Sequence, residues 1–399
     1  MRPAVLFILV TVMLDAMGIG LIMPIMPDLI REVQGGSLAN AALWGGVLST
    51  VFAVMQFLFG PIVGNLSDRF GRRPVLLIST AVMAVDYLVM ALAGSIWLLL
   101  VGRVIGGITA ATGSTANAYM ADISKPEEKA ANFGLIGAGF GIGFVLGPLI
   151  GGLLAEFGTR APFYAAAALA GLNFLFGYIV LKETVTERIR RPFEWRRANP
   201  LGAFRQLGKL DEVRPLLWVY FIYSVAFFVY PAIWSYFGQA RFGWTPQLIG
   251  LSLALFGIMM AIVQGGLIRV VLRRFGERKT VVYGHVFDVA AFGAMAVVTS
   301  GTVALILTPL AALAAVITPA LQGIMSKAVS DDAQGELQGV LSSVNALATI
   351  ISPLVMTGVF WAFTTPDAPV YWPGAPFAVS AVLMVLGLVV FVRAGRNVA

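Results

Sequence analysis

Long apolar stretches, repeated from one end of the chain to the other, are the feature that most constrains its fold. Each is long enough to cross a hydrocarbon core of about 30 Å as an α-helix. Because the core of a bilayer offers no water to backbone N–H and C=O groups, nearly all of these groups must be paired within helices. Of the 399 residues only 12% are charged, against about 25% in a typical soluble domain. The sequence therefore predicts an all-α membrane protein without a soluble catalytic domain.

Hydropathy predicts twelve transmembrane helices, six in each half of the chain. The candidate spans are residues 4–27, 41–63, 74–94, 96–121, 132–155, 161–181, 215–238, 246–268, 280–299, 302–326, 337–363 and 371–392. We expect three parts: an N-terminal six-helix bundle over residues 1–181, a cytoplasmic linker over 182–214 and a C-terminal six-helix bundle over 215–399. The linker is polar, and we expect it to be solvated and to lie against anionic headgroups.

The basic residues lie almost entirely in alternate loops. One set of loops contains Arg2, Arg69–Arg73, Lys125 and Lys129, the linker through Arg214, Arg269–Lys279, Lys327 and the C-terminal tail. The opposite loops contain only Arg31, Arg160 and Arg241. Because cytoplasmic loops carry an excess of Lys and Arg, both termini are predicted to be cytoplasmic. This placement explains the net charge of +7 without a nucleic-acid partner.

Two absences argue against an enzyme. The chain has no cysteine, which excludes disulfides, thiolate metal sites and cysteine nucleophiles. Its single histidine, His285, cannot build a metal cluster alone, and no paired acids stand at metal-ligand spacing. We therefore expect no resident metal or cofactor.

The two halves are related by a constant offset of 205 residues. The matched pairs are Gly71 and Gly276, Gly134 and Gly339, and Pro148 and Pro353. Two six-span repeats in one chain are typical of a transporter that functions as a monomer, with its site between the repeats near the middle of the membrane. A channel would instead be expected to repeat filter loops or charge rings in identical subunits.

Four ionisable residues lie deep within the predicted spans: Asp15, Asp86, Arg103 and Asp288. Each costs about 3 kcal/mol to place there, so a functional role is the default interpretation. Arg103 has two candidate partners, Asp15 and Asp86, and a structural ion pair is the alternative interpretation. With three acids and one base, at least one carboxyl lacks a basic partner and is suited to take up and release a proton.

His285 stands three residues before Asp288 and therefore on the same helix face. The imidazole is a candidate to orient that carboxylate or to pass protons to it, and a packing role is the alternative. The repeat offset takes Asp86 to Ala291, about one turn beyond Asp288. The two acids are thus expected on similar faces of corresponding helices.

Two motifs carry further predictions. In GNLSDRFGRRPVLL, residues 64–77, Gly64 is expected to permit a close helix approach, Gly71 to form the turn, and Asp68 to lie near Arg72 and Arg73. Such charges suit either a latch that opens and closes or a marker of topology. In GFGIGFVLGPLIGGLL, residues 139–154, the glycines Gly143, Gly147 and Gly151 share one helix face and Pro148 is expected to bend the helix. No strand precedes GFGIG, so a dinucleotide site is excluded.

These motifs resemble those of the major facilitator superfamily, the second resembling its drug/proton antiporters. Nearly the whole chain is similar to the bacterial tetracycline/proton antiporters, notably in LDAMGIGLIMPIMP, AVDYLVMA and GRVIGGITAATGSTANAYMADI. The resemblance implies a major facilitator fold in a bacterial inner membrane. It also implies exchange of a cytoplasmic drug for an incoming proton by alternating access, the drug being tetracycline chelated to a divalent cation such as Mg²⁺.

Residue roles follow from the same resemblance. It implies that Asp15, Asp86, Asp288 and Arg103 handle substrate and proton, and that Asp68, Arg72 and Arg73 form the gate. One departure is that Met260 stands where the branch commonly has a histidine. Either His285 replaces that imidazole or coupling relies on the acids alone. The departure also favours the alternative of a multidrug or small-metabolite exporter that does not carry tetracycline.

Candidate substrate-wall residues are polar or aromatic and lie in spans two, four, seven and eight. They are Gln56, Asn117, Tyr230, Trp234 and Gln264. A flat, polyhydroxylated drug requires stacking surfaces and a few fixed hydrogen bonds. Tyr230 and Trp234 are equally suited to anchor their helix at the membrane interface.

Overall fold

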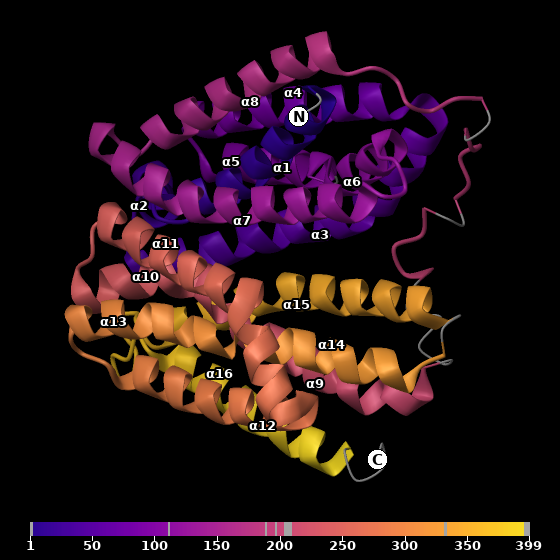
Figure 1. Ribbon diagram of the computed structural model, residues 1–399. Helices are drawn as coiled ribbons and strands as arrows, with labels where there is room; N and C mark the ends of the chain where they lie inside the picture. The colour runs from indigo at the N-terminus through magenta and orange to yellow at the C-terminus, as the bar shows by residue number, and fades with distance from the viewer. Residues whose placement is uncertain are drawn as a thin grey trace. The chain divides into compact units, whose positions relative to one another are not determined.

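The computed structural model describes residues 3–110, 112–187, 190–195, 198–202, 210–330 and 333–394, and this part of the chain contains helices and no β-strand (Figure 1). The α-helices are α1 (Pro3–Ile22), α2 (Met26–Gln34), α3 (Leu38–Phe70), α4 (Arg72–Leu92), α5 (Ile96–Thr109), α6 (Thr112–Ile123), α7 (Lys129–Leu154), α8 (Ala161–Val180), α9 (Arg214–Phe227), α10 (Val229–Phe242), α11 (Pro246–Ile262), α12 (Ile268–Val297), α13 (Gly301–Ala311), α14 (Ile317–Ala328), α15 (Gln334–Ala362) and α16 (Ala375–Ala394). Four short helical segments are η1 (Ala155–Phe157), η3 (Asp211–Val213), the π-helical η4 (Val263–Leu267) and η5 (Ala312–Val316).

The described residues contain 11 helical runs that are long and apolar enough to cross a membrane. One of them, Pro246–Val297, has 52 residues, which is about 78 Å of helix and more than twice the thickness of a hydrocarbon core. Gly276 interrupts this run with φ 72° and ψ 166°. The run therefore supplies two spans, and the prediction of an all-α fold with twelve spans is confirmed.

Helix boundaries extend the sequence repeat. The offset of 205 residues takes the first residues of α5 and α7, Ile96 and Lys129, to the first residues of α13 and α15, Gly301 and Gln334. It also takes the last residues of α4 and α6, Leu92 and Ile123, to those of α12 and α14, Val297 and Ala328. Even a cap is repeated, because Ser95 and Ser300 each accept a hydrogen bond from the backbone N–H three residues later.

The chain forms two compact units. Unit 1 comprises residues 1–35, 51–200 and 246–254, and unit 2 comprises residues 36–50, 201–245 and 255–399. Two helices are divided between the units: the first part of α3 belongs to unit 2 and the rest to unit 1, whereas the first part of α11 belongs to unit 1 and the rest to unit 2. The predicted three-part division at residues 181 and 214 stays a prediction.

The packing of α7 against α1 organises unit 1, where the two helices run side by side (Figure 1). A Cβ atom added to Gly143, Gly147 or Gly151 would lie 2.2, 2.5 or 2.3 Å from a backbone carbonyl oxygen of α1. Only glycine permits this approach, so the stripe brings the two backbones into direct contact. Pro148 lies within the same helix, which continues to Leu154.

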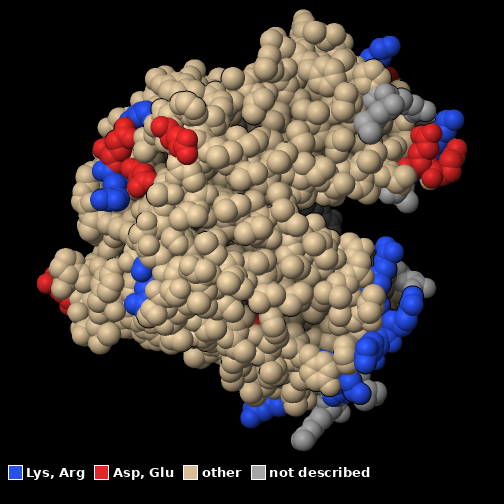
Figure 2. Space-filling model, turned by 60° about the vertical axis from the view of Figure 1, so that its left-hand side comes forward, with Lys and Arg blue, Asp and Glu red and all other residues tan. Residues whose placement is uncertain are grey.

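Charged side chains are sparse on the molecular surface. On the face shown in Figure 2, charged side chains gather in a few groups near the edges, several of which contain both signs of charge, and broad areas of other residues lie between these groups. Large apolar side chains are instead exposed on the helices, among them Trp97 at 65%, Val382 at 68% and Ile179 at 80%. Such exposure suits helices that are surrounded by lipid.

Candidate functional site

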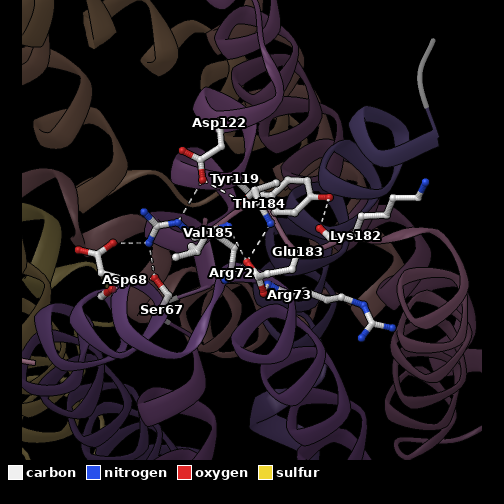
Figure 3. Close-up of polar contacts among 11 residues, drawn as sticks. Ser67, Asp68, Arg72, Arg73, Tyr119, Asp122, Lys182, Glu183, Thr184 and Val185 are labelled. Carbon is white, nitrogen blue, oxygen red and sulfur yellow. Dashed lines mark hydrogen bonds and ion pairs between the residues drawn. The ribbon is translucent and has the colours of Figure 1, made fainter. Parts of the chain in front are cut away.

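A sharp turn between α3 and α4 organises the first candidate site. Gly71 separates the two helices with φ 111° and ψ 154°, a conformation that residues with a Cβ rarely adopt. The turn places Arg72 and Arg73 in the first turn of α4, facing residues from three other segments. We call this site the α3–α4 cluster; its members are Ser67, Asp68, Arg72, Arg73, Asp122 and Glu183 (Figure 3).

Arg72 is the centre of the α3–α4 cluster. Its Nη1 donates hydrogen bonds to Ser67 Oγ, at 2.7 Å, and to Asp68 Oδ1. Its Nε donates to Asp122 Oδ2 at 3.4 Å. The guanidinium therefore joins the end of α3 to the end of α6. The sequence predicted the pair with Asp68 and missed Asp122, although an acid at the end of a span is itself a signal for a basic partner.

Glu183, which the sequence analysis also missed, binds the beginning of α4 from the segment after α8. Its Oε1 accepts a hydrogen bond from the Arg72 N–H at 2.9 Å, and its Oε2 accepts one from the Arg73 N–H at 3.2 Å. The first N–H groups of a helix lack partners within it, and a negative charge there is favourable. A Cβ on Gly71 would lie 2.1 Å from Glu183 Oε2, so space as well as backbone conformation requires glycine.

Arg73 points away from Asp68, contrary to the prediction. Its Nε donates to the Leu181 carbonyl at 2.8 Å and its Nη2 to the Tyr178 carbonyl at 3.0 Å. The guanidinium also lies 5.5 Å from the centroid of the Tyr178 ring. The last carbonyls of a helix lack partners within it, and a cation there is favourable. Arg73 therefore caps the C-terminal end of α8, whereas Arg72 pairs with the carboxylates of Asp68 and Asp122.

The described part of the linker is largely exposed and is also hydrogen-bonded to the same region, a contact that the sequence analysis did not predict. Besides the two hydrogen bonds that Glu183 accepts, four more join them. They are Tyr119 Oη to the Lys182 carbonyl at 3.0 Å, Thr184 Oγ1 to Asp122 Oδ2 at 2.9 Å, the Arg191 N–H to the Asp68 carbonyl at 3.3 Å, and Asn65 Nδ2 to the Glu194 carbonyl at 2.9 Å. The linker is thus part of the surroundings of the α3–α4 cluster.

Gly64 does not show the close helix approach that its position predicted. A Cβ there would lie 3.8 Å from Ser114 Oγ, an ordinary van der Waals distance. The helices have room for a side chain at this position.

A second candidate site is the buried ion pair of unit 1. Arg103 Nη2 donates to Asp86 Oδ2 at 3.0 Å, and the two residues are 9% and 5% exposed. The guanidinium also lies 5.2 Å from the centroid of the Phe52 ring. A Cβ on Gly102 or Gly106 would lie 2.8 or 2.6 Å from the Asp86 carboxylate, so the two glycines of α5 make room for it. Asp86, and not Asp15, is therefore the partner of Arg103.

Asp15 is a carboxyl without such a partner. It lies half-buried on α1, and within the described residues no hydrogen bond or ion pair is recorded for it. The one basic side chain predicted in the membrane is occupied by Asp86.

Asp288 and His285 lie in the core of unit 2, at 1% and 0% exposure. His285 Nδ1 lies 2.8 Å from the Val281 carbonyl of its own helix, and its ring centroid is 6.2 Å from that of Tyr223. Among the described contacts, no hydrogen bond joins His285 to Asp288. The shared face predicted from their spacing therefore does not bring the imidazole onto the carboxylate here.

The candidate substrate-wall residues fall into two groups. Tyr230 and Trp234 are buried in an aromatic cluster of unit 2, with Phe377 5.6 Å from Tyr230 and 6.1 Å from Trp234 by ring centroids. The other three, Gln56, Asn117 and Gln264, are exposed. Gln56 donates to the Ala110 carbonyl at 3.4 Å, and Gln264 lies in the π-helical turn η4. Their role in binding a substrate stays a prediction.

A repeated fold of apolar helices, with buried acids in each unit and a charged cluster at one turn, defines a multi-pass membrane transporter. The chain belongs to the Major Facilitator Superfamily, whose family pattern matches residues 8–353.

Curated relatives match the chain over nearly its full length. It is 42% identical to the class C tetracycline resistance protein of Escherichia coli, covering 96% of this chain and 95% of that protein. It is 40% identical to the class G tetracycline resistance protein of Vibrio anguillarum, covering 98% of each. Among solved structures, the human organic anion transporter MFSD10 (TETRAN) is 26% identical and superimposes with a TM-score of 0.68 over 98% of this chain and 99% of that one.

Proposed function

We propose that the protein is a proton-coupled drug exporter of a bacterial inner membrane, and that its cargo is tetracycline chelated to a divalent cation such as Mg²⁺. The observation that carries the proposal is the pairing pattern of the buried acids. Asp86 is neutralised by Arg103, whereas no basic partner is recorded among the described residues for Asp15 or Asp288. The tetracycline resistance proteins that match nearly the whole chain support the choice of cargo.

Drug and proton can be exchanged if both cations, the drug–metal complex and the proton, bind the same carboxyl group in turn. A deprotonated carboxylate attracts the monocationic drug complex from the cytoplasm, and protonation from outside removes the charge and releases the drug. The inward movement of one proton gains about 2.3 kcal/mol per 100 mV of membrane potential. Asp15 and Asp288 are the candidates for this carboxyl, one in each unit.

Alternating access completes the proposal. Both termini lie in the cytoplasm, because the basic loops then fall on the inner side. The α3–α4 cluster is then cytoplasmic, and its ion pairs form and break as the transporter changes state. A single chain with two repeats suffices, so the functional unit is a monomer.

Uptake of tetracycline and Mg²⁺ into inverted membrane vesicles tests the proposal. Asp288→Asn removes the exchangeable charge with little change of shape, so proton-driven uptake should be lost. Asp367→Asn makes the same chemical change at an exposed acid of unit 2 and should transport like the parent. Normal uptake by Asp288→Asn would refute the coupling role of Asp288.

A multidrug or small-metabolite exporter is the second candidate, and the methionine at position 260 favours it. Growth of a sensitive bacterium that expresses the chain, across a small antibiotic panel, separates the two. Resistance to ethidium without resistance to tetracycline would establish the second candidate.

A further inference from the structure

A charge-reversed counterpart of the α3–α4 cluster lies in unit 2. The repeat offset of 205 residues takes Asp68 to Arg273, Arg72 to Glu277 and Asp122 to Lys327. The sign of the charge is inverted at all three positions. A substitution at one position would remove an ion pair, whereas inversion at partnered positions can preserve it.

The partnered positions do preserve the ion pair. Lys327 Nζ lies 2.7 Å from Glu277 Oε1 in unit 2, as Arg72 Nε lies 3.4 Å from Asp122 Oδ2 in unit 1. Each pair joins the residue that follows a glycine of positive φ to the residue at or next to the end of the following span.

Local structure fixes the second pair in the same way as the first. Gly276 has φ 72° and precedes Glu277, as Gly71 precedes Arg72. A Cβ on Gly323 would lie 2.7 Å from Glu277 Oε1, so the carboxylate rests against the backbone of α14, four residues before Lys327.

The second site is smaller than the first. The offset takes Glu183 to Leu388, so no carboxylate corresponds to the one that caps α4. Within the described residues, Arg273 is exposed and has no recorded ion pair, unlike Asp68. The two repeats therefore share an ion pair at equivalent positions, Arg72 with Asp122 in unit 1 and Glu277 with Lys327 in unit 2. The sign of each charge is reversed between them.

A topology marker does not account for this pair. Positive charge alone orients a loop, and Glu277 reduces the positive charge of its loop. A role in stabilising the fold does not account for the pair either. The Lys327 side chain is 72% exposed, and exposed ion pairs contribute little to the free energy of unfolding. A weak pair that is maintained in both repeats, with opposite polarity, suits a contact that breaks and re-forms.

We infer that Glu277 and Lys327 form a second gate site. When the ion pair is formed, it holds the turn at Gly276 of α12 against the end of α14, and the pair breaks during the transport cycle. This inference rests on the proposed export function. It assigns to unit 2 a switching contact of its own, whose partners carry the charges opposite to those of unit 1.

Transport by single and charge-swapped variants tests the inference. Glu277→Gln and Lys327→Gln should each lower the initial rate of tetracycline uptake into inverted vesicles about two- to fivefold, the range that an exposed ion pair supports. The double variant Glu277→Lys/Lys327→Glu should recover most of the rate with the pair reversed. Lys279→Gln, at an exposed neighbour, is the control and should transport like the parent.

Two further readouts separate a gate from simple packing. Because a gate acts on state changes, the single variants should lower the maximal rate while Tm stays at the parental value. Parental rates in both single variants, or a charge-swapped variant no faster than they are, would overturn the inference. Equal falls in rate and Tm in all three variants would assign the pair to helix packing.

Hydrogen exchange distinguishes failure of the inference from failure of the proposed cargo. Vesicles of the parent that do not accumulate tetracycline would count against the cargo and not against the pair. In that case Glu277→Gln should still speed amide exchange at the end of α14, residues 320–328, relative to parent and Lys279→Gln. Unchanged exchange there would overturn the inference without reference to any drug.

Discussion

At the scale of single residues, the pairing of Arg103 with one of the buried acids determines which carboxyls lack a basic partner. Arg103 is committed to Asp86, with its ring contact to Phe52 and two glycines of α5 shaping the space around the carboxylate. The sequence placed these groups deep within the spans and left two candidate partners open. Which acid pairs with Arg103 depends on how the side chains of α4 and α5 pack against each other, and the spacing of residues along the chain does not specify this packing.

Removal of one partner from this buried pair should be far more costly than removal of both. Asp86→Asn leaves the Arg103 guanidinium buried without an opposite charge, for which about 3–5 kcal/mol of destabilisation is typical. The double variant Asp86→Asn/Arg103→Gln removes both charges and should recover much of that loss. Thermal unfolding of the purified variants in detergent measures the difference. A double variant less stable than Asp86→Asn would show that the guanidinium is held mainly by other contacts.

Glu32 provides a prediction of pH dependence outside the spans. Hydrogen bonds from Thr159 and Arg160 lower the pKa of the Glu32 carboxyl below its ordinary value. A lowered pKa in the folded state contributes stability above the pKa of the unfolded chain, about 4.3, and this contribution is lost as the pH falls through the folded value. Because the pair is exposed, Glu32→Gln should lower Tm by no more than about 2 °C at pH 7.

The Tm of the same variant should approach that of the parent as the pH falls through the folded pKa of Glu32, because the carboxyl is then protonated and the stabilising charge is lost. Tm measured across this range checks the sign. A gap between the two proteins that widens on acidification would contradict the assignment.

At the scale of helices, the glycines of α7 differ sharply in what surrounds them. Gly143 meets the Met13 carbonyl of α1, whereas nothing lies within 4 Å of a Cβ at Gly141. Gly143→Ala should therefore force the helices apart and lower Tm. Gly141→Ala should raise Tm slightly, because alanine is favoured over glycine in a helix by about 0.5–1 kcal/mol. Unfolding of the two variants side by side tests the contrast, and equal effects would disprove the close approach.

Glu183 should stabilise the first turn of α4. Loss of a helix cap typically costs about 1 kcal/mol, so Glu183→Ala should lower Tm modestly and speed amide exchange at Arg72 and Arg73. Glu187→Ala is the matched control, since it removes from the same linker an acid whose ion pair, within the described residues, is with Arg190. Identical exchange in the two variants would mean that the backbone N–H groups at the start of α4 do not depend on the carboxylate.

Hydropathy and the repeat offset predicted the spans of these helices, because both depend on residues close together in the sequence. The sequence did not predict Glu183 as a cap or Leu181 as the acceptor for Arg73, since each contact joins segments more than 100 residues apart. Nor did it predict that the linker would bind α3 and α6. Polar composition indicates exposure to water, but it does not exclude hydrogen bonds from the linker to the protein.

At the scale of the whole molecule, the repeat explains more than the fold. Three matched residues predicted two copies, and the structure extends the match to helix ends and to the caps at Ser95 and Ser300. The copies differ in their charges: unit 1 contains the buried pair of Asp86 with Arg103, whereas the same offset places Ala291 and Thr308 in unit 2. The two repeats therefore share a fold but differ in the ionisable residues that they bury.

This division bears on the proposed proton coupling, because Met260 stands where the resemblance to the antiporters leads us to expect a histidine. The sequence left two routes open, a relay through His285 or the acids alone. In unit 2 the imidazole lies 2.8 Å from the carbonyl of Val281 and packs near Tyr223, and no bond to Asp288 is recorded among the described contacts. This geometry favours the acids alone. His285→Ala should therefore leave the pH dependence of tetracycline uptake unchanged, even where loss of packing lowers Tm.

The pH–rate profile of uptake in inverted vesicles separates these two effects, because a packing defect scales the rate at every pH, whereas loss of a proton relay changes the shape of the profile. His285→Gln, which keeps a polar side chain of similar reach, should retain more of the rate than His285→Ala and the same profile. A displaced profile in both variants would instead establish His285 as the substitute for the missing histidine, and the coupling route would then pass through unit 2 by way of that ring.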